Sequence, residues 1–447
     1  MLIDRPRYTD EILSFRDVDT IKVITGVRRC GKSSLLRLVS QRLEAEGIPS
    51  HRLITLNLES MEHHISNHED LYSYLKERIT NKDKHYLFID EVQLIPLWER
   101  EINALRVDFD TDIYITGSNA SLLSGQLATL LSGRYITIEV RPLVFSEYLL
   151  FNGLYPVAPH ATSVKVTTEN GDSVEYPIPP SLLLETLNFV ATKDGVLIPA
   201  DTFFSQFQTF GGLPQIALQA KTEEQHAGLM RAFYDTVIKY DVSERMYGKD
   251  STRINKTEEF EKLCLFLADN IGNRTNLSKI AQALTRSGSS ISVPTIKRYV
   301  TALSDAFVFY PIKRFDIKGK KCFDNPDKYY IVDVGLRNYL SHYKNADQGR
   351  SLENIVLLQL LYDGFDVTVG SLYQTEVDFI ATKGSDTIYI QVTDSMEKED
   401  TLERELKPLR SIRDAHTKIV VVGHGSYPTD IDGIKIITAT NFLLGSN

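Results

Sequence analysis

Cysteine is scarce in this sequence of 447 residues, which contains only Cys30, Cys264 and Cys322. Their wide spacing excludes a Cys-x-x-Cys metal knuckle, and their odd number favours a reducing compartment over a disulfide framework. No stretch approaches the roughly 18 uncharged apolar residues of a membrane span, and the charged N-terminal segment contains no signal-peptide core. We therefore expect a cytoplasmic protein without a membrane segment.

An excess of positive charge is also lacking, because 50 Lys and Arg residues stand against 59 Asp and Glu residues, a formal net charge of −9. This balance excludes a chain that coats nucleic acid with uniform positive charge, although a local basic face is still allowed. The hydrophobic fraction of 42% is typical of soluble globular proteins. A chain of this length indicates about three domains.

Apolar strand-like segments alternate with helix-like segments in the first 150 residues. The β-branched and apolar runs predict strands at residues 20–26, 51–58, 85–90, 112–118 and 134–140, with helices between most neighbours, such as residues 98–109. Strands of this buried type that alternate with helices indicate an α/β fold with a parallel, doubly wound sheet.

A glycine-containing loop joins the first predicted strand to its helix and matches the pattern G-x-x-x-x-G-K-[ST]. In such a loop the backbone N–H groups face a phosphate at the positive end of a helix. Lys32 would reach the β- and γ-phosphates, and the hydroxyl of Ser33 would bind Mg²⁺. The predicted nucleotide-binding residues are Gly26, Val27, Arg28, Arg29, Cys30, Gly31, Lys32, Ser33 and Ser34.

Two adjacent carboxylates, Asp90 and Glu91, end the predicted strand at residues 85–90. Parallel strands bring their carboxyl ends to one edge of a sheet, which is where a phosphate site forms. We expect Asp90 to hold the metal and Glu91 to orient and deprotonate the attacking water.

Polar and basic side chains near the next strands are further candidates. Asn119, or failing that Ser118, could position the water or sense the γ-phosphate, but a turn with a helix cap explains these residues equally well. Arg134 or Arg141 could act as an arginine finger, in its own chain or on a neighbouring subunit, although a lone arginine at a strand start is usually a surface residue.

The segments GVRRCGKSSLL, YLFIDEVQ, ITGSNASLLS, LSGRY and VRPLVFSEYL resemble the AAA-type P-loop ATPases of bacteria and archaea that carry a conserved C-terminal domain of unknown function. The likeness continues through GGLP, IKYDVSER and YYIVDVGLRNYL. The resemblance implies an ATP-binding core of the additional-strand-catalytic-glutamate type, a winged-helix region and a terminal domain similar to restriction-endonuclease-like folds. It also favours adenine as the base.

The pattern changes along the chain divide it into four segments. We predict an AAA-type ATPase domain at 1–150, a linker or inserted β-element at 151–205, a helical and winged-helix region at 206–345, and a nuclease-like α/β domain at 346–447. The inserted element contains a predicted hairpin whose turn is Asn170-Gly171.

Residues 277–304 predict a helix-turn-helix, in which apolar residues follow one face of the second helix. A basic strand and loop follow at 307–323, as in a wing that contacts phosphates. A packing module with an ordinary solvated loop is the alternative. The candidate nucleic-acid contacts are Lys297, Arg298, Lys313, Arg314, Lys318, Lys320 and Lys321.

A nuclease-like pattern lies near the C-terminus. Glu353 begins an apolar helix, Glu376 and Asp378 share one face of a predicted strand, and Gln391 and Thr393 share a face of the next. A PD-(D/E)xK nuclease has Glu-x-Lys where this chain has Gln391-Val392-Thr393, so a metal ligand and the lysine that activates water are replaced. We expect a degenerate site in a domain that is used for binding.

Together these patterns predict an ATP-dependent switch, in which hydrolysis moves the ATPase core relative to a C-terminal binding module. One alternative is a DNA-binding or DNA-processing protein that ATP regulates. Another is an interaction or signalling ATPase that binds a protein partner through its C-terminal domain. The sequence leaves the oligomeric state open.

Overall fold

The computed structural model describes residues 2–79, 83–118, 131, 133–158, 161–167, 173–179, 188–220, 222–242, 257–286, 288, 291–343, 348–372 and 375–445. The chain divides into a first unit of residues 1–142 and 305–307 and a second unit of residues 143–304 and 308–447. The first unit thus ends before residue 150, where the sequence predicts the end of the ATPase domain. Among the described residues, no helix combines the length and apolar character that a membrane crossing requires.

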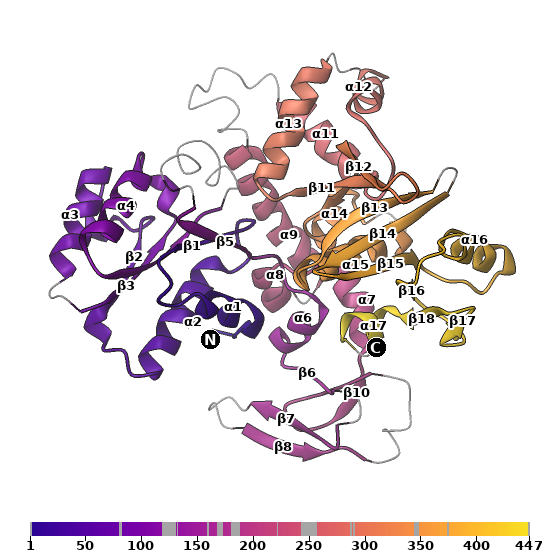
Figure 1. Cartoon of the computed structure of the whole chain (residues 1–447), viewed down its shortest axis with the longest axis horizontal. Coiled ribbons are helices and arrows are strands. Elements are labelled where there is room, and N and C mark those ends of the chain that lie inside the picture. Colours follow the sequence, from indigo (N-terminus) through magenta and orange to yellow (C-terminus); the bar gives the residue numbers. More distant parts are fainter. Residues whose placement is uncertain are drawn as a thin grey trace. The chain divides into compact units, whose positions relative to one another are not determined.

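Five parallel strands form the sheet of the first unit (Figure 1). Their order is β2-β3-β4-β1-β5, and each pair of neighbours is parallel. The predicted parallel sheet is therefore confirmed, with β4 inserted between β1 and β3. The strands are β1 (Ile21–Thr25), β2 (Leu53–Asn57), β3 (His85–Asp90), β4 (Thr111–Thr116) and β5 (Tyr135–Glu139).

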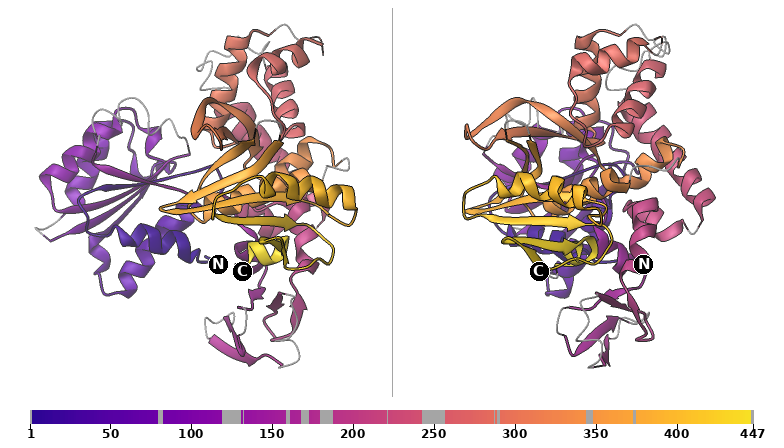
Figure 2. Two further views of the ribbon diagram at one scale, coloured as in Figure 1. Left: turned by 45° about the vertical axis from the view of Figure 1, so that its right-hand side comes forward. Right: turned by 90° about the vertical axis from the view of Figure 1, so that its right-hand side faces the viewer.

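Helices cover both faces of this sheet, with α1 and α2 on one face and α3 and α4 on the other (Figure 2). Strands β1 and β3 are buried along their whole length, as expected for a sheet that is covered on both faces. The helices are α1 (Pro6–Ser14), α2 (Lys32–Ala45), α3 (His68–Arg78) and α4 (Trp98–Asp108), and short 3₁₀ turns η1 (Ser50–Arg52), η2 (Met61–His63) and η3 (Val92–Leu94) join them to the strands.

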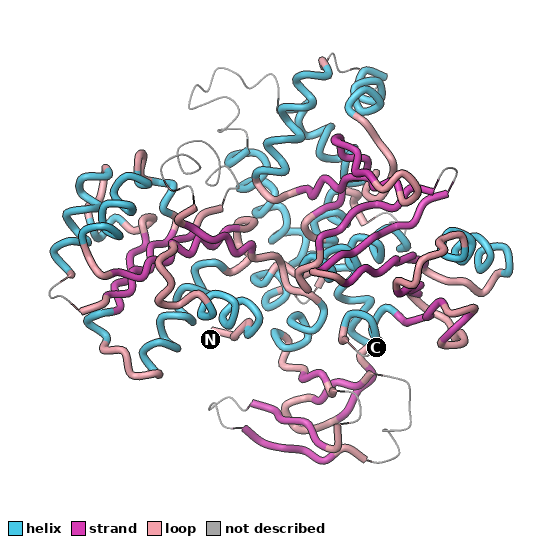
Figure 3. The backbone as a smooth tube through the Cα atoms, viewed as in Figure 1, coloured by secondary structure: helices cyan, strands magenta, loops and turns pink. Residues whose placement is uncertain are grey.

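Helices, drawn in cyan in Figure 3, occupy much of the second unit. They are α6 (Phe145–Phe151), α7 (Asp201–Phe210), α8 (Pro214–Gln219), α9 (Glu223–Tyr234), the π-helical segment η6 (Asp235–Val242), α11 (Thr257–Asp269), α12 (Leu277–Arg286), α13 (Val293–Asp305), α14 (Val334–Leu340), α15 (Gln348–Tyr362), α16 (Glu399–Arg410) and α17 (Ala439–Leu443).

An eight-stranded mixed sheet organises the second unit, in the order β12-β11-β13-β14-β15-β16-β18-β17. The pairs β11–β13, β15–β16 and β16–β18 are parallel, and the other pairs are antiparallel. Its strands are β11 (Phe309–Asp316), β12 (Lys321–Ile331), β13 (Asp366–Leu372), β14 (Thr375–Lys383), β15 (Asp386–Thr393), β16 (Thr417–Val422), β17 (Asp430–Ile431) and β18 (Ile434–Thr438).

This sheet crosses the boundary that the sequence predicts at residue 345. The basic segment at 307–323, predicted as a wing, contributes β11 and the start of β12, and β11 pairs in parallel with β13 from the nuclease-like segment. Helix α15 packs against this sheet and is buried on nearly all sides. The helical and nuclease-like segments therefore share one hydrophobic core.

The inserted segment at 151–205 forms two small antiparallel sheets. One contains β6 (Tyr155–Pro156), β9 (Phe189–Ala191) and β10 (Leu197–Pro199), and the other contains β7 (Ser163–Thr167) and β8 (Ser173–Pro177). Strands β7 and β8 pair with Val166 opposite Val174, in agreement with the predicted hairpin. Its predicted turn at Asn170-Gly171 lies outside the described residues.

Helices α12 and α13 occupy the predicted helix-turn-helix. The apolar face of α13 is buried as its spacing predicts, at Ile296, Tyr299, Val300 and Leu303. Lys297 and Arg298 are exposed on the opposite face.

Asp333 joins two motifs that are distant in the sequence, GGLP at 211–214 and DVGL at 333–336. Its buried carboxylate accepts hydrogen bonds from the backbone N–H of Gly212 (2.6 Å) and of Leu336 (3.1 Å). A Cβ atom at Gly335 would lie 2.1 Å from the carbonyl oxygen of Phe210, so only glycine allows this approach.

Burial raises the pKa of Asp333 to about 6, although backbone N–H donors oppose the effect. Because the folded state then binds this proton more tightly than the unfolded chain, the free energy of unfolding falls as pH rises from about 4 to about 6, by roughly 3 kcal/mol at most.

We predict that Asp333→Asn flattens this part of the pH profile, measured by urea unfolding between pH 4 and 7. A variant at an exposed position, Asp386→Asn, serves as the control, and a slope that Asp333→Asn leaves unchanged would contradict the assignment.

Candidate functional site

The loop between β1 and α2 curls tightly at the carboxyl edge of the five-stranded sheet. Gly26 has a φ of +138°, and a Cβ atom there would lie 2.0 Å from the carbonyl oxygen of Val140, so no other residue fits. Arg29 and Gly31 also have positive φ values, of 66° and 101°. Backbone that turns in this way directs successive N–H groups towards the inside of the loop, where an anion can bind.

Lys32 places its ammonium inside this loop. Its Nζ donates hydrogen bonds to the carbonyl oxygens of Gly26 (3.0 Å) and Val27 (3.1 Å), and the side chain is buried. Ser33 and Ser34 follow on the first turn of α2 and are half-buried. A buried cation next to a helix N-terminus and a ring of backbone N–H groups provides the donor set that a phosphate requires.

Arg5 supports the loop from outside, which the sequence did not reveal. Its Nη1 donates to the carbonyl oxygen of Cys30 (3.1 Å), and its guanidinium lies 4.5 Å from the ring centre of Tyr8. Cys30 is fully buried, and burial raises the pKa of its thiol. Arg28 forms an ion pair with Glu59 at 3.3 Å.

One hydroxyl, that of Thr116, holds both predicted carboxylate residues. It donates a hydrogen bond to Oδ1 of Asp90, and it accepts one from the backbone N–H of Glu91 at 2.9 Å. Thr116 is fully buried and Asp90 nearly so. Thr116 lies on β4, which pairs with β3 on one side and with β1 on the other. Its hydroxyl therefore connects the end of β3, where Asp90 and Glu91 lie, to the strand next to β1 and its loop. The sequence did not assign this role to Thr116, because both of its partners follow from another strand, β3.

Glu91 has a left-handed backbone, with a φ of 56° and a ψ of 46°. A residue with a Cβ atom adopts this conformation at a cost of about 1–2 kcal/mol, so the surroundings must fix it. The side chain of Gln93 donates from Nε2 to Oε2 of Glu91. Gln93 is therefore a second neighbour of the site that the sequence did not single out.

Arg134 lies at the opposite edge of the sheet. Its carbonyl oxygen accepts from the N–H of Ile21 (2.8 Å) at the start of β1, and its Nη1 donates to Asn103. The five residues of β1 separate it from the loop by about 16 Å at 3.3 Å per residue. The expectation of a finger acting within its own chain is therefore not met, because β5 runs parallel to β1. Arg141 follows the other end of β5, where its Nη2 pairs with Glu139 at 2.9 Å.

The other predicted polar residues of this edge are only partly visible. Ser118 is buried beyond the end of β4, and the N–H of Gly117 before it bonds to the carbonyl oxygen of Ile24 (3.1 Å). Asn119, predicted to position water, lies outside the described residues.

A second polar cluster lies in the second unit, where Glu353, Glu376 and Asp378 surround the ammonium of Lys328. Nζ of Lys328 lies 3.2 Å from Oε1 of Glu353 and 3.8 Å from Oδ1 of Asp378, and it also contacts Oε1 of Glu376. The hydroxyl of Tyr330 donates to Glu353 at 2.5 Å. The three carboxylates that the sequence predicted to converge are therefore brought together.

Lys328 comes from β12, outside the motif in which a lysine was expected. Strand β12 is fixed to α15 by Asn354, whose side chain accepts from the N–H of Ile331 and donates to its carbonyl oxygen, both at 2.8 Å. This pairing brings Lys328 next to Glu353. A motif search that is confined to β14 and β15 cannot find a lysine on β12.

The charges in this cluster are strongly coupled. Burial by itself would lower the pKa of Lys328, but the three carboxylates outweigh it and the pKa is raised. Burial and the charge of Glu353 raise the pKa of Asp378 well above its usual range, although Lys328 opposes this. The three carboxylates thus favour the charged form of Lys328, and Lys328 in turn opposes the rise in the pKa of Asp378.

Gln391 and Thr393 form hydrogen bonds with different partners. Gln391 donates from Nε2 to Glu405 (2.8 Å), and its Oε1 lies 3.4 Å from the backbone nitrogen of Asp378. Thr393 donates to the carbonyl oxygen of Ser395 (3.3 Å). In the part of the chain that the structure describes, no group of three or more His, Cys, Asp or Glu residues is arranged to hold a metal ion.

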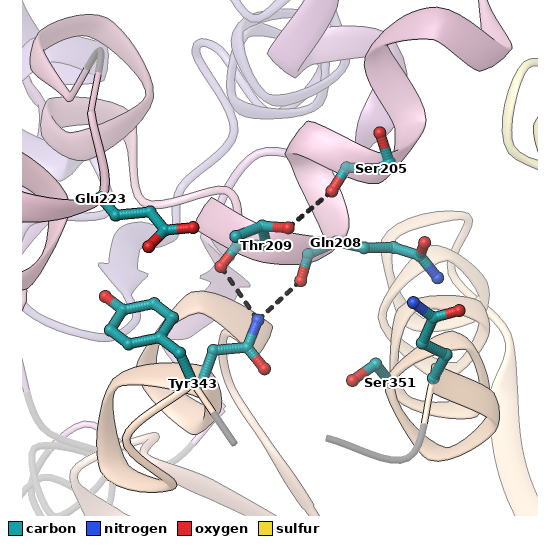
Figure 4. Close-up of a pocket in the computed structure, with 8 residues that line it drawn as sticks. Ser205, Gln208, Thr209, Glu223, Tyr343 and Ser351 are labelled. Atoms are coloured by element: carbon teal, nitrogen blue, oxygen red, sulfur yellow. Dashed lines mark hydrogen bonds between the residues drawn. The ribbon is translucent and has the colours of Figure 1, made fainter. Parts of the chain in front are cut away.

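A polar cavity of about 460 Å³ lies among α7, α9, α14 and α15 (Figure 4). Asn338 closes one wall by donating to the carbonyl oxygens of Gln208 (2.8 Å) and Thr209 (2.9 Å). The charged residue of its lining is Glu223, which disfavours a phosphate ligand. The lining residues are Ser205, Gln208, Thr209, Glu223, Asn338, Tyr343, Gln348 and Ser351.

Replacing Lys328 by an uncharged residue tests how strongly its ammonium stabilises the three carboxylates around it. We predict that Lys328→Met lowers the free energy of unfolding at pH 7 by about 3–5 kcal/mol, because buried carboxylates lose their counter-ion. Mn²⁺ should reverse part of this loss, because a divalent cation can replace the missing positive charge. Urea unfolding with and without Mn²⁺ measures both effects, with exposed Lys313→Met on β11 as control. Equal stability of the two variants would contradict the prediction.

Known protein families match two parts of the chain. The sequence profile of an AAA domain matches residues 18–149, and that of a domain of unknown function matches residues 202–347. An uncharacterized protein of Haemophilus influenzae is 36% identical over 445 residues, which cover 99% of this chain and 99% of that relative. An uncharacterized protein of Methanocaldococcus jannaschii is 30% identical over 397 residues, covering 87% of this chain and 77% of that relative. The solved Walker-type ATPase paby2304 of Pyrococcus abyssi is similar with a TM-score of 0.43 and 14% identity, over 76% of this chain and 95% of that protein.

Proposed function

Because this chain belongs to the bacterial and archaeal family that joins an AAA-type P-loop ATPase domain to a C-terminal domain of unknown function, we propose that it hydrolyses ATP with Mg²⁺ and acts as a nucleotide-driven switch in the cytoplasm. The observation that carries the proposal is the joint fixation of Asp90 and Glu91 by Thr116, at the same sheet edge as the loop of Lys32. A phosphate-binding loop by itself would support nucleotide binding only.

The residues present fit ATP and Mg²⁺. The inward-facing N–H groups of the loop and the ammonium of Lys32 would bind the β- and γ-phosphates, and Ser33 and Asp90 would hold Mg²⁺. Mg²⁺, when bound, neutralises charge on the phosphates. Asp90 is suited to this task because Thr116 fixes one of its oxygens and thereby limits its rotation.

Glu91 would act as the general base. Its backbone N–H is bound to Thr116 and its Oε2 to Gln93, so both ends of the residue are held. A base held in this way can accept a proton from water without first being ordered, which lowers the entropic part of the barrier. Arg141 is the candidate finger at the correct edge of the sheet, whereas Arg134 could act only on a neighbouring copy of the chain.

We propose that the C-terminal segment is a binding module for a protein partner and is not a nuclease. Thr393 stands where a nuclease lysine is expected, and Lys328 lies among the carboxylates that would otherwise bind a divalent cation. ATP can change the position of such a module only if the protein has two conformations that make different contacts with the nucleotide. The C-terminal site then serves stability, and the ATPase site supplies the change of state.

Two variants separate binding from hydrolysis. We predict that Lys32→Ala weakens ATP binding at least tenfold, because the ammonium inside the loop is lost. Glu91→Gln should keep binding within twofold but lower kcat by about 10²–10⁴-fold, because an amide cannot accept the proton. Fluorescent-nucleotide titration and phosphate release measure the two quantities. Wild-type protein that binds no adenine nucleotide, or full turnover by Glu91→Gln, would overturn the proposal.

DNA binding is a second candidate, favoured by the exposed basic turn between β11 and β12. Lys318, Lys320 and Lys321 are exposed around this turn, whose N–H groups at 318 and 319 are fixed by Asp316. The guanidinium of Arg314 lies 4.2 Å from the ring centre of Phe323. Cations next to an aromatic ring at a solvent-exposed turn suit a nucleic-acid backbone.

Salt dependence tests this candidate. If the turn contacts phosphates, the plot of log affinity for duplex DNA against log salt should have a slope that becomes about three smaller in magnitude when Lys318, Lys320 and Lys321 are all changed to Gln, because each contact releases about 0.9 counterion. Exposed Lys435→Gln is the control, since it lies on β18. A slope that the triple variant leaves unchanged would remove DNA binding by this turn.

A further inference from the structure

Gln93 is held against the proposed general base in a defined orientation. It lies two residues after Glu91 in the 3₁₀ turn η3, and its Nε2 donates to Oε2 of Glu91. A carboxylate can only accept hydrogen bonds, so the amide must present its nitrogen to Glu91 and its oxygen elsewhere. The orientation of Gln93 is therefore fixed by chemistry.

The other end of this amide lacks a partner. Oε1 of Gln93 is buried and makes no hydrogen bond within the described part of the chain. Buried polar atoms without a partner are rare in folded proteins, since each one forfeits its hydrogen bonds to water. An acceptor of this kind beside Glu91 indicates that a donor joins it when the site is in use.

The turn itself does not require this side chain. The backbone closes η3 through the N–H of Leu94 to the carbonyl oxygen of Glu91 (3.1 Å) and the N–H of Ile95 to that of Val92 (3.2 Å). The fully buried side chain of Val92 anchors the turn in the core. A purely structural role for Gln93 therefore leaves its contact with Glu91 unexplained.

We propose that Gln93 is a positioning residue for ATP hydrolysis that orients both Glu91 and the attacking water, an inference that depends on the proposed function. Nε2 of Gln93 engages Oε2 of Glu91, so that Oε1 of Glu91 receives the proton. Oε1 of Gln93 accepts the second O–H bond of the same water. The water oxygen thus has two acceptors that fix its direction.

The step balances without a further reactant. The water oxygen forms a bond to the γ-phosphorus while the bond from that phosphorus to the ADP oxygen breaks, and the electron pair of that bond leaves with ADP. One proton of the water moves to Glu91, which later returns it to solvent. The other proton stays on the oxygen that becomes part of the phosphate product, so Gln93 neither gains nor loses a proton.

The test compares Gln93→Met with Gln93→His in the full-length protein with Mg·ATP. Methionine keeps the length of the side chain but has no amide, so kcat should fall about 10- to 100-fold while KM and the Kd for ATP change less than twofold. Histidine offers an N–H at similar reach, and it should restore at least a third of the lost activity. The exposed neighbour Leu94→Ala is the matched control and should retain full kcat.

Non-additivity separates positioning of the base from an unrelated effect. In a Glu91→Gln background, Gln93→Met should lower kcat by clearly less than it does in the wild-type background, because the base that Gln93 orients is already absent and only its contact with the water is left to lose. A full additional loss in that background, or unchanged kcat in Gln93→Met alone, would overturn the inference. Wild-type protein without ATP turnover would instead overturn the proposed function. Thermal unfolding of each variant shows whether it folds, and Gln93→Leu, which also lacks an amide, replaces Gln93→Met if that variant does not.

Discussion

The hydroxyl of Thr116 is the interaction on which the arrangement of the proposed ATPase site depends. It contacts the side chain of Asp90 and the backbone of Glu91, so one buried group fixes both the carboxylate proposed to hold Mg²⁺ and the backbone of the proposed general base. Such a bridge is possible only because β4 lies between β3 and β1. The strand order therefore acts directly on the chemistry, since it determines which side chain can reach both residues. The left-handed backbone of Glu91 is retained because this contact compensates its conformational cost.

In the second unit, a single lysine compensates the charge of three neighbouring carboxylates. Three carboxylates that share a poorly solvated interior repel one another, and removing each from water costs free energy unless a cation compensates their charge. Lys328 supplies the charge from a strand that precedes the nuclease-like segment in the sequence. A cluster that resembles a degenerate metal site can thus be maintained as part of the core, independent of any metal.

Local patterns in the sequence were sufficient to predict the five-stranded sheet, its loop and the convergence of three C-terminal carboxylates. Periodicity and the G-x-x-x-x-G-K-S pattern depend on neighbours in the chain, and these also determine strands, helices and tight loops. Thr116, Gln93 and Lys328 could not be assigned in this way, since each acts through a residue on another strand or through its own rotamer. Arg134 was one of two candidate fingers, and its position at the start of β5, which runs parallel to β1, puts it at the sheet edge away from the loop. The domain boundary predicted at residue 345 cuts through a sheet that both segments share. The sequence does not reveal this sheet, because the paired strands β11 and β13 are about fifty residues apart in the chain.

The eight-stranded sheet has a consequence for how this protein can evolve. Strand β11 takes one neighbour from the helical segment and the other from the nuclease-like segment, so removing either segment would leave an unpaired strand edge, which promotes association with other chains. The two segments must therefore be inherited together, and recombination that exchanges one of them without the other would be selected against. Among the described residues, β7 and β8 form a separate two-stranded sheet, so removing either segment would leave their pairing intact, although β7 packs against the neighbouring small sheet. Insertions and deletions between related proteins should accumulate there first.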